Sequence, residues 1–324
     1  MKKKVIAGLA LGALLVYLSV RGIQLQEVAY GFRTIHYGYA IPVLAALFLM
    51  QVLRSFRWGL ILNPLEKVDQ LSLFSVTSVG FLAIIAIPAR LGELARPYLI
   101  TKKSRIPMSS ALGTIFVERL LDTITILIIA VFVLFFTPLP PWVVRSGFLL
   151  LLLTLALFVL MFLLIVRRDS SLRVLGHLVG RLPARYADRI KRIISHFLEG
   201  FRIMADPVLL MSVAGLSIII WLVDVLAIYL LFLAFDFQLP VAAAFVLMII
   251  LIIGIAIPAA PGFIGNWHYF CVLGLSIFGI PKTDALTFAI IYHFLSIGIV
   301  VVLGLIFLPF NRFSVSDLRR QARS

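Results

Sequence analysis

The sequence predicts an all-α polytopic membrane protein with about six full transmembrane helices plus two re-entrant helical hairpins in inverted repeats. Three observations lead to this fold class. The 324-residue chain is 62% hydrophobic and only 13% charged, against roughly 45–50% and about 25% in soluble domains. Apolar runs of about 20 residues, enough to cross a bilayer, recur along it. Its 29 Lys and Arg residues are concentrated in a few segments between these runs.

Six apolar runs are long enough to be full spans that cross the membrane once. They cover residues 4–20, 38–60, 107–136, 143–166, 208–235 and 283–310. Two further apolar stretches, 72–100 and 241–279, are interrupted in the middle by helix breakers. These hairpin breaks are Pro88 and Gly92 in the first stretch, and Pro258, Pro261, Gly262 and Gly265 in the second. Pro88 and Pro258 are predicted to occupy the first positions of second half-helices.

The positive charges indicate how the interrupted stretches lie in the membrane. If each stretch returns to the side that it left, 22 of the 29 Lys and Arg residues fall on one face. A single crossing by 72–100 would place the cation-rich loop 167–206 outside, against the positive-inside rule. The sequence therefore predicts two re-entrant hairpins. It also predicts a multi-pass protein of the cell inner (cytoplasmic) membrane, with both the N- and C-termini cytoplasmic.

Residues 1–324 are expected to form a single transmembrane domain, because the loop 167–206 is too short for a core of its own. Within this loop, apolar residues from Ile190 to Phe201 follow helical spacing and alternate with basic ones. That pattern predicts a cytoplasmic amphipathic helix anchored at the membrane surface. Asp206 and Pro207 suit the N-cap and first position of the next span.

An internal repeat relates the two interrupted stretches. The segment IIAIPARLGELARPYLI (84–100) aligns with GIAIPAAPGFIGNWHYF (254–270), and IPMSSALGTIFVERLLDTI (106–124) aligns with IPKTDALTFAIIYHFLSIG (280–298). The predicted orientations of the two units are opposite, so we assign 38–136 to the first repeat and 208–310 to the second, inverted repeat. Inverted repeats with interrupted helices are a recurring transporter design, with the site near the bilayer midplane.

Polar residues within the membrane segments are the candidate substrate-binding residues, because ionisable groups there are costly and usually face a cavity or the bundle interior. They are Arg90, Glu93, Arg96, Glu118, Arg119 and Asp122 in the first repeat, and Asn266, His268 and His293 in the second. A buried ion-pair network that ties the hairpin to the next span is the alternative to a role in transport. Arg54 and Arg57 could help to bind an anionic headgroup, but we favour their interpretation as residues that snorkel to the interface. Asp224 is left open between capping a neighbouring backbone break and joining the cavity.

The spacing of the acidic residues also makes a local prediction. Arg119 and Asp122 are three positions apart on one helix and can pair, whereas Glu118 and Asp122 share a face and repel when both are ionised. The set of three arginines and three carboxylates, counted from Arg90 to Asp122, is neutral when fully ionised. An anionic group that enters it would therefore leave excess negative charge. We hypothesise that Glu93, Glu118 or Asp122 then takes up a proton.

Motifs of common enzyme classes are absent from the sequence, which holds no HExxH, P-loop or GxSxG pattern. The single cysteine, Cys271, excludes an internal disulfide. We expect no catalytic residue, no metal site and no cofactor. The net charge of +15 is interpreted as a topology signal, so the expected partners are the lipid bilayer and a membrane lipid substrate, with no nucleic acid. A homodimer is left open.

At IPARLGELARPYLI, FVERLLDT and PAAPGFIGNWHYF, the chain resembles the transmembrane region of the lysylphosphatidylglycerol synthases, also called the flippase-like or UPF0104 family. The resemblance covers nearly all of the chain. It implies a polytopic protein linked to the movement of lipids between leaflets, including aminoacylated phosphatidylglycerol. The matching positions are Gly92, Glu93, Arg96, Glu118, Arg119, Asp122, Pro261, Gly262 and Gly265. The acidic residue expected after the glycines of the second repeat is missing, because His268 and Tyr269 follow Trp267.

These observations together predict a flippase-like lipid translocase that moves an anionic or polar-headgroup lipid between membrane leaflets, with proton coupling as a hypothesis. Arg96 and Arg119 are expected to bind the headgroup, since the arginine fork suits phosphate. Two alternatives are a membrane-embedded transferase that acts on a lipid-linked substrate and a non-transporting membrane accessory protein.

Overall fold

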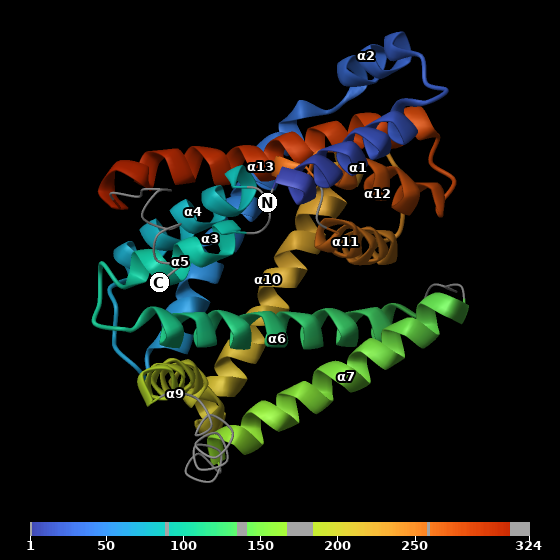
Figure 1. Cartoon of the computed structure of the whole chain (residues 1–324). Coiled ribbons are helices and arrows are strands. Elements are labelled where there is room, and N and C mark those ends of the chain that lie inside the picture. The colour runs from blue at the N-terminus through green and yellow to red at the C-terminus, as the bar shows by residue number, and fades with distance from the viewer. Residues whose placement is uncertain (1, 88–90, 135–140, 167–183, 258–259, 312–324) are drawn as a thin grey trace.

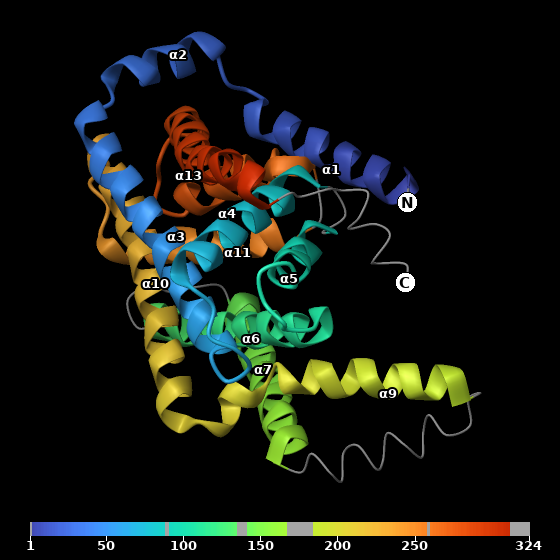
Figure 2. The ribbon, with the colours of Figure 1, turned by 90° about the vertical axis from the view of Figure 1, so that its left-hand side faces the viewer.

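The computed structural model is all-helical over the residues that it describes, which are 2–87, 91–134, 141–166, 184–257 and 260–311. Figures 1 and 2 show long helices that cross at several angles, without a sheet in this part of the chain. The helices are α1 (Lys2–Val20), α2 (Leu25–Thr34), α3 (Ala40–Leu62), α4 (Gln70–Ala86), α5 (Ala95–Ile100), α6 (Met108–Leu134), α7 (Pro141–Val166), α9 (Ala184–Glu199), α10 (Pro207–Ala234), α11 (Val241–Ala256), α12 (Asn266–Ser276) and α13 (Lys282–Asn311).

The described helices fit a membrane protein. By length and composition, α3, α10 and α13 can each cross a bilayer. Helices α1, α6 and α7 occupy the other three predicted spans. Helix α7 exposes many large apolar side chains, among them Phe148, Leu152 and Val159, as expected of a surface in contact with lipid. The all-α membrane class is thereby supported, whereas six crossings and re-entrant hairpins stay predictions.

Both interrupted stretches form a helix, a break and a second helix. In the first, α4 is followed by a short 3-10 turn, Leu91–Leu94, and then by α5. In the second, α11 is followed by the turn Pro261–Phe263 and then by α12. The second half-helices therefore begin at Ala95 and Asn266.

The predicted starts of the second half-helices, Pro88 and Pro258, lie outside the described residues. After each break, the first α-helical residues that the structure describes are Ala95 and Asn266. In the second break the cause is visible, because Gly262 and Gly265 have φ values of +68° and +91°. An α-helix excludes such values, which glycine adopts without steric cost. Gly262 and Gly265 therefore lie where the helical path of the second stretch is interrupted.

The two predicted repeats contain the same elements in the same order: a long helix, an interrupted helix and a long helix. The first set is α3, α4, α5 and α6, and the second is α10, α11, α12 and α13. Helix α3 packs along α10, while α4 packs against α13 and α11 packs against α6. This exchange of partners is what a two-fold axis between the sets would produce.

Helix α1 covers the second break. A Cβ atom on Gly265 would lie 2.3 Å from the carbonyl oxygen of Gly12 in α1, and a Cβ on Gly12 would lie 2.8 Å from the Cβ of Ala260. Glycine at both positions allows this close approach. Lipid cannot satisfy the hydrogen-bonding groups of broken backbone, so protein must cover the break, and α1 supplies part of that cover.

Helix α9 forms within the predicted amphipathic loop, of which residues 167–183 lie outside the described residues. It is seen end-on in Figure 1 and lengthwise in Figure 2, so it runs across the direction of α6. Its apolar residues Phe197 and Leu198 pack in a cluster with α6 and α10, while Tyr186 and Ile193 stay exposed. One side of α9 is therefore buried on protein and another faces outward.

The predicted start of α10 is confirmed. The side chain of Asp206 accepts a hydrogen bond of 3.0 Å from the backbone N–H of Leu209, and Pro207 is the first helical residue. Proline suits this position because its missing N–H would have no partner inside the helix. Asp69 caps α4 in the same way through the N–H of Ser72, which lowers the pKa of the Asp69 carboxyl.

Candidate functional site

Arg96 of α5 and Glu118 of α6 form a bidentate ion pair in the protein interior. The two terminal nitrogens of Arg96 donate to the two carboxylate oxygens at 3.0 and 2.9 Å, and each residue is only 1% exposed. The guanidinium lies 4.3 Å from the ring centroid of Trp58, and Gly80 leaves room for the arginine stem. The paired hydrogen bonds and the ring fix the guanidinium in one orientation.

Arg57 of α3 joins Glu118 to Asp122. Its Nη2 lies 3.1 Å from Oδ2 of Asp122 and 3.4 Å from Oε1 of Glu118, and its Nη1 donates to Ser217 Oγ at 2.8 Å. Trp221 donates from Nε1 to Asp122 Oδ1 at 3.2 Å. The two carboxylates on one face of α6 therefore share a cation between them, which offsets their repulsion.

The interpretation of Arg57 as a snorkelling residue is wrong, because this residue is 1% exposed and points into the bundle. It lies near the end of α3, where an arginine can reach either the interface or the interior. The signal for the inward orientation was Asp122, an intramembrane acid that needs a cation. Arg54, one turn earlier, is half-buried and lies over the Phe81 ring at 5.2 Å.

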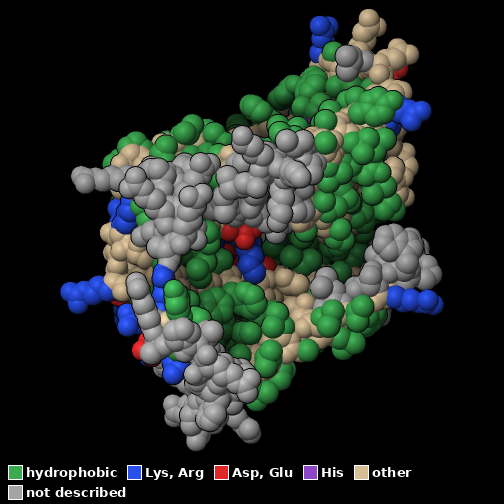
Figure 3. Space-filling view, viewed as in Figure 1, with side chains coloured by type: hydrophobic (Ala, Val, Ile, Leu, Met, Phe, Trp, Pro, Cys, Tyr) green, Lys and Arg blue, Asp and Glu red, His purple; other side chains and the backbone are tan. Residues whose placement is uncertain are grey.

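Arg119 lies at the edge of this network. Its side chain is 49% exposed, and its Nη1 is 4.0 Å from Asp122 Oδ2, so the predicted pair is present but loose. Glu93 is half-buried in the turn Leu91–Leu94, and Arg90 lies outside the described residues. Figure 3 shows acidic and basic side chains together in a recess at the centre of one face, between apolar surfaces.

Asn266 ties together the two halves of the second interrupted helix. Its Nδ2 donates to the carbonyl oxygens of Gly254 and Ile257, both at 2.8 Å, and the residue is completely buried. These carbonyls are at the end of α11, where intrahelical partners run out. Asn266 aligns with Arg96 of the first repeat, yet it contacts backbone rather than a carboxylate.

The two histidines of the second repeat also gather around its break. His293 Nε2 lies 2.7 Å from the carbonyl oxygen of Gly262, and the His268 and His293 rings are 4.9 Å apart. The geometry gives His293 a backbone partner within the turn Pro261–Phe263. This arrangement fixes the turn to α13.

A polar pair that was not predicted links α10 to α13. The hydroxyl of Tyr292 donates to Asp224 Oδ1 at 3.2 Å. Tyr292 aligns with Glu118 at the offset of 174 residues, and Asp224 lies 170 residues after Arg54, the offset of the first aligned block. In the first set, Glu118 contacts Arg57, three residues after Arg54. Both sets thus have a contact between the last and the first long helix that involves a charged residue, but not at the same aligned position.

Comparison with known proteins agrees with this reading of the sequence. A family model for the lysylphosphatidylglycerol synthase TM region matches residues 5–304. The chain belongs to this family. Membership confirms the resemblance that the three motifs indicate, and it gives this protein a lipid-related function in the membrane.

Two curated relatives align with most of this chain. A UPF0104 membrane protein of Methanothermobacter thermautotrophicus is 24% identical over 296 residues, which are 86% of this chain and 87% of the relative. Another, from Methanocaldococcus jannaschii, is 25% identical over 224 residues, which are 68% of this chain and 90% of the relative. No solved structure matches the chain.

Proposed function

We propose that this protein moves a phospholipid with an anionic headgroup between the two membrane leaflets, and that Arg119 binds the headgroup phosphate. Membership in a lipid-related membrane family supports the substrate class. The observation that carries the proposal is a half-exposed cation beside a buried, paired network inside apolar protein. Such a cation is costly within a membrane unless it has a function there.

The geometry favours Arg119 over Arg96 as the phosphate ligand. Arg96 uses both terminal nitrogens on Glu118 and stacks on Trp58, so a phosphate would have to break a buried pair. Removing one partner of such a pair is strongly unfavourable. Arg119 has only a 4.0 Å contact with Asp122, so its guanidinium can turn toward a ligand while Arg57 keeps Asp122 paired.

Arg57 also changes the charge balance of the site. When Arg57 is added to the set predicted from the sequence, the count becomes four arginines (Arg57, Arg90, Arg96 and Arg119) and three carboxylates (Glu93, Glu118 and Asp122). The fully ionised set then carries one excess positive charge, which a phosphodiester with one negative charge would neutralise. The electrostatic argument for proton uptake is thereby removed. We propose that movement of a monoanionic lipid is not coupled to protons.

A liposome assay tests this function. Liposomes that contain only this protein, with a fluorescent anionic phospholipid in one leaflet, should show transfer to the other leaflet. The Arg119→Gln variant should lower the rate about tenfold or more, because it removes hydrogen bonds to a charged group. Arg145→Gln is a matched control, since Arg145 is an exposed arginine on α7, and it should leave the rate unchanged.

The same assay separates the alternatives. A transferase would change the mass of the labelled lipid, and an accessory protein would neither move nor modify it. Either result with the wild-type protein contradicts the proposal. A pH gradient across the liposome should leave net movement unchanged, and a response to the gradient would restore the proton-coupled hypothesis.

A further inference from the structure

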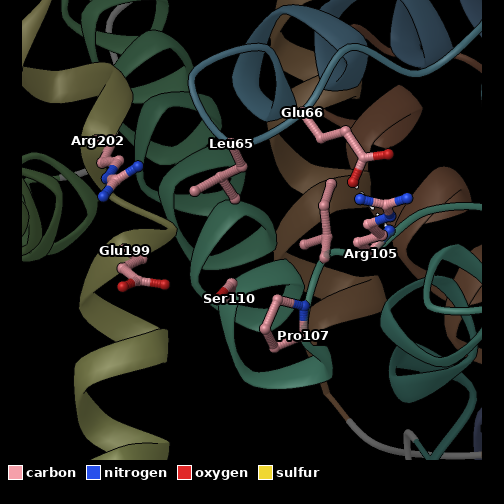
Figure 4. A pocket seen from close by; sticks show the side chains of 8 residues that line it. Leu65, Glu66, Arg105, Pro107, Ser110, Glu199 and Arg202 are labelled. Atoms are coloured by element: carbon pink, nitrogen blue, oxygen red, sulfur yellow. Dashed lines mark hydrogen bonds between the residues drawn. The ribbon is translucent and has the colours of Figure 1, made fainter.

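A polar cavity lies near the start of α6, apart from the ion-pair network. It has a volume of about 560 Å³, within the range of small-ligand sites. It is lined by the loop after α3, the loop before α6, the first turn of α6, the last residue of α9 and the 3-10 turn that follows α9 (Figure 4). Ser110 in this cavity precedes Glu118 by eight residues, or roughly 12 Å of helix, so the cavity is distinct from the ion-pair network. The adjoining loops belong to the predicted cytoplasmic face.

The charged groups of this cavity are balanced. Arg105 and Arg202 supply two positive charges, and Glu66 and Glu199 supply two negative ones. Figure 4 shows Glu66 beside Arg105 on one side, and Glu199 and Arg202 together on the other. A ligand with only negative charge would meet two carboxylates here. A ligand that carries both a phosphate and an ammonium group would find partners for both charges.

Ser110 provides an independent indication of a ligand. It is completely buried, and within the described structure its hydroxyl has no hydrogen-bond partner. A buried hydroxyl without a partner is unfavourable by itself. Ser110 lies in the first turn of α6, where backbone N–H groups have no intrahelical acceptor and favour an anion. A phosphate oxygen in the cavity would satisfy the hydroxyl.

The carboxylates can serve an ammonium group. Glu66 Oε2 accepts a hydrogen bond of 2.8 Å from the backbone N–H of Arg105, which fixes the position of its side chain. A carboxylate has about four acceptor sites, so it can also accept from a primary ammonium. The apolar residues Leu65 and Ile106 line the same cavity, which suits the glycerol end of a lipid.

We propose that this cavity binds the headgroup of a phospholipid that carries a phosphate and a primary ammonium, as in phosphatidylethanolamine. The phosphate lies at Ser110 and the arginines, and the ammonium lies at the carboxylates. This inference goes beyond the proposed function and does not depend on it, because a bound lipid at the surface requires no transport.

Native mass spectrometry of the full-length protein in detergent tests the site. Phosphatidylethanolamine should bind more tightly than phosphatidylglycerol, which lacks the ammonium, and than phosphatidylcholine, whose methylated ammonium cannot donate a hydrogen bond. Ser110→Ala should weaken phosphatidylethanolamine binding about tenfold, since the lost bond is to a charged phosphate. Glu66→Gln should abolish the preference over phosphatidylglycerol.

Ser78→Ala is the matched control, because Ser78 is also a buried hydroxyl without a partner but lies in α4. It should leave binding unchanged. If Ser110→Ala prevents folding, Arg202→Gln can be used in its place, because Arg202 is exposed. It should also weaken phosphatidylethanolamine binding. Equal binding of all three lipids, or equal effects of Ser110→Ala and Ser78→Ala, would overturn the proposal. Free phosphoethanolamine that binds as tightly as the lipid would overturn the lipid assignment and indicate a soluble ligand.

Discussion

At the scale of single residues, the interior is organised by charges whose partners lie on different helices. The Arg119–Asp122 pair could be predicted, because both residues lie on one helix at a known spacing. The Arg57–Asp122 pair joins positions 65 residues apart. Helix periodicity places neither side chain relative to the other, so only the packing of α3 against α6 reveals this pair. The sequence identified the acids of the site but only part of its cations.

The buried pair predicts a particular pattern of stability. Arg96→Gln and Glu118→Gln should each lower the free energy of unfolding by about 3–5 kcal/mol, because each leaves a buried charge without its main partner. The double variant should lose less than the sum of the two single variants. Unfolding in mixed detergent micelles measures all three. Additive effects would contradict the paired geometry.

Gly80 offers a second test at this scale. A Cβ at this position would lie 2.2 Å from Cγ of Arg96, so Gly80→Ala should displace the arginine and cost about 1–3 kcal/mol. Gly215, in α10, has no atom within 4 Å of such a Cβ. Gly215→Ala should therefore be neutral or stabilise by about 0.5–1 kcal/mol. Equal effects in the same unfolding measurement would show that Gly80 does not hold space for Arg96.

At the scale of elements, the breaks in α4–α5 and α11–α12 could be predicted from their prolines and glycines. The exact starts of the half-helices could not, because the 3-10 turns depend on local backbone conformation rather than on composition. The sequence alone also does not show that α1 covers the second break. Gly12 reads as an ordinary glycine in an apolar helix, and only its contact with Gly265 reveals its function.

The covering role of α1 can be measured with the native cysteine. Cys271 is completely buried in α12, close behind the second break. Gly12→Leu should push α1 away from the break and increase the rate at which a hydrophilic maleimide labels Cys271 severalfold. Gly215→Leu is the control, since it adds the same side chain to a helix position with open space. Unchanged labelling in Gly12→Leu would mean that α1 does not cover the break.

At the scale of the whole molecule, the protein is predicted to contain two sets of helices with opposite orientation. The exchange of partners among α4, α6, α11 and α13 supports such a relation. The buried Arg57 and half-buried Arg54 no longer count as loop residues, which leaves 20 Lys and Arg residues on the predicted inner face. The outer face has four, so the charge asymmetry persists. The charge distribution allows a prediction of which helix ends face the cytoplasm. The packing of α4 against α13 and of α11 against α6 could not be predicted from the sequence.

The accessibility of cysteines placed at positions 103 and 282 shows whether the two sets have opposite orientations in the membrane. Both residues are exposed; Lys103 lies in the loop before α6, and Lys282 is the first residue of α13. Lys103→Cys and Lys282→Cys are made separately in a Cys271→Ala background and labelled in sealed vesicles of known orientation with a membrane-impermeant maleimide. We predict labelling of Lys103→Cys from the cytoplasmic side and of Lys282→Cys from the opposite side. Labelling of both positions from the same side would contradict the inverted arrangement.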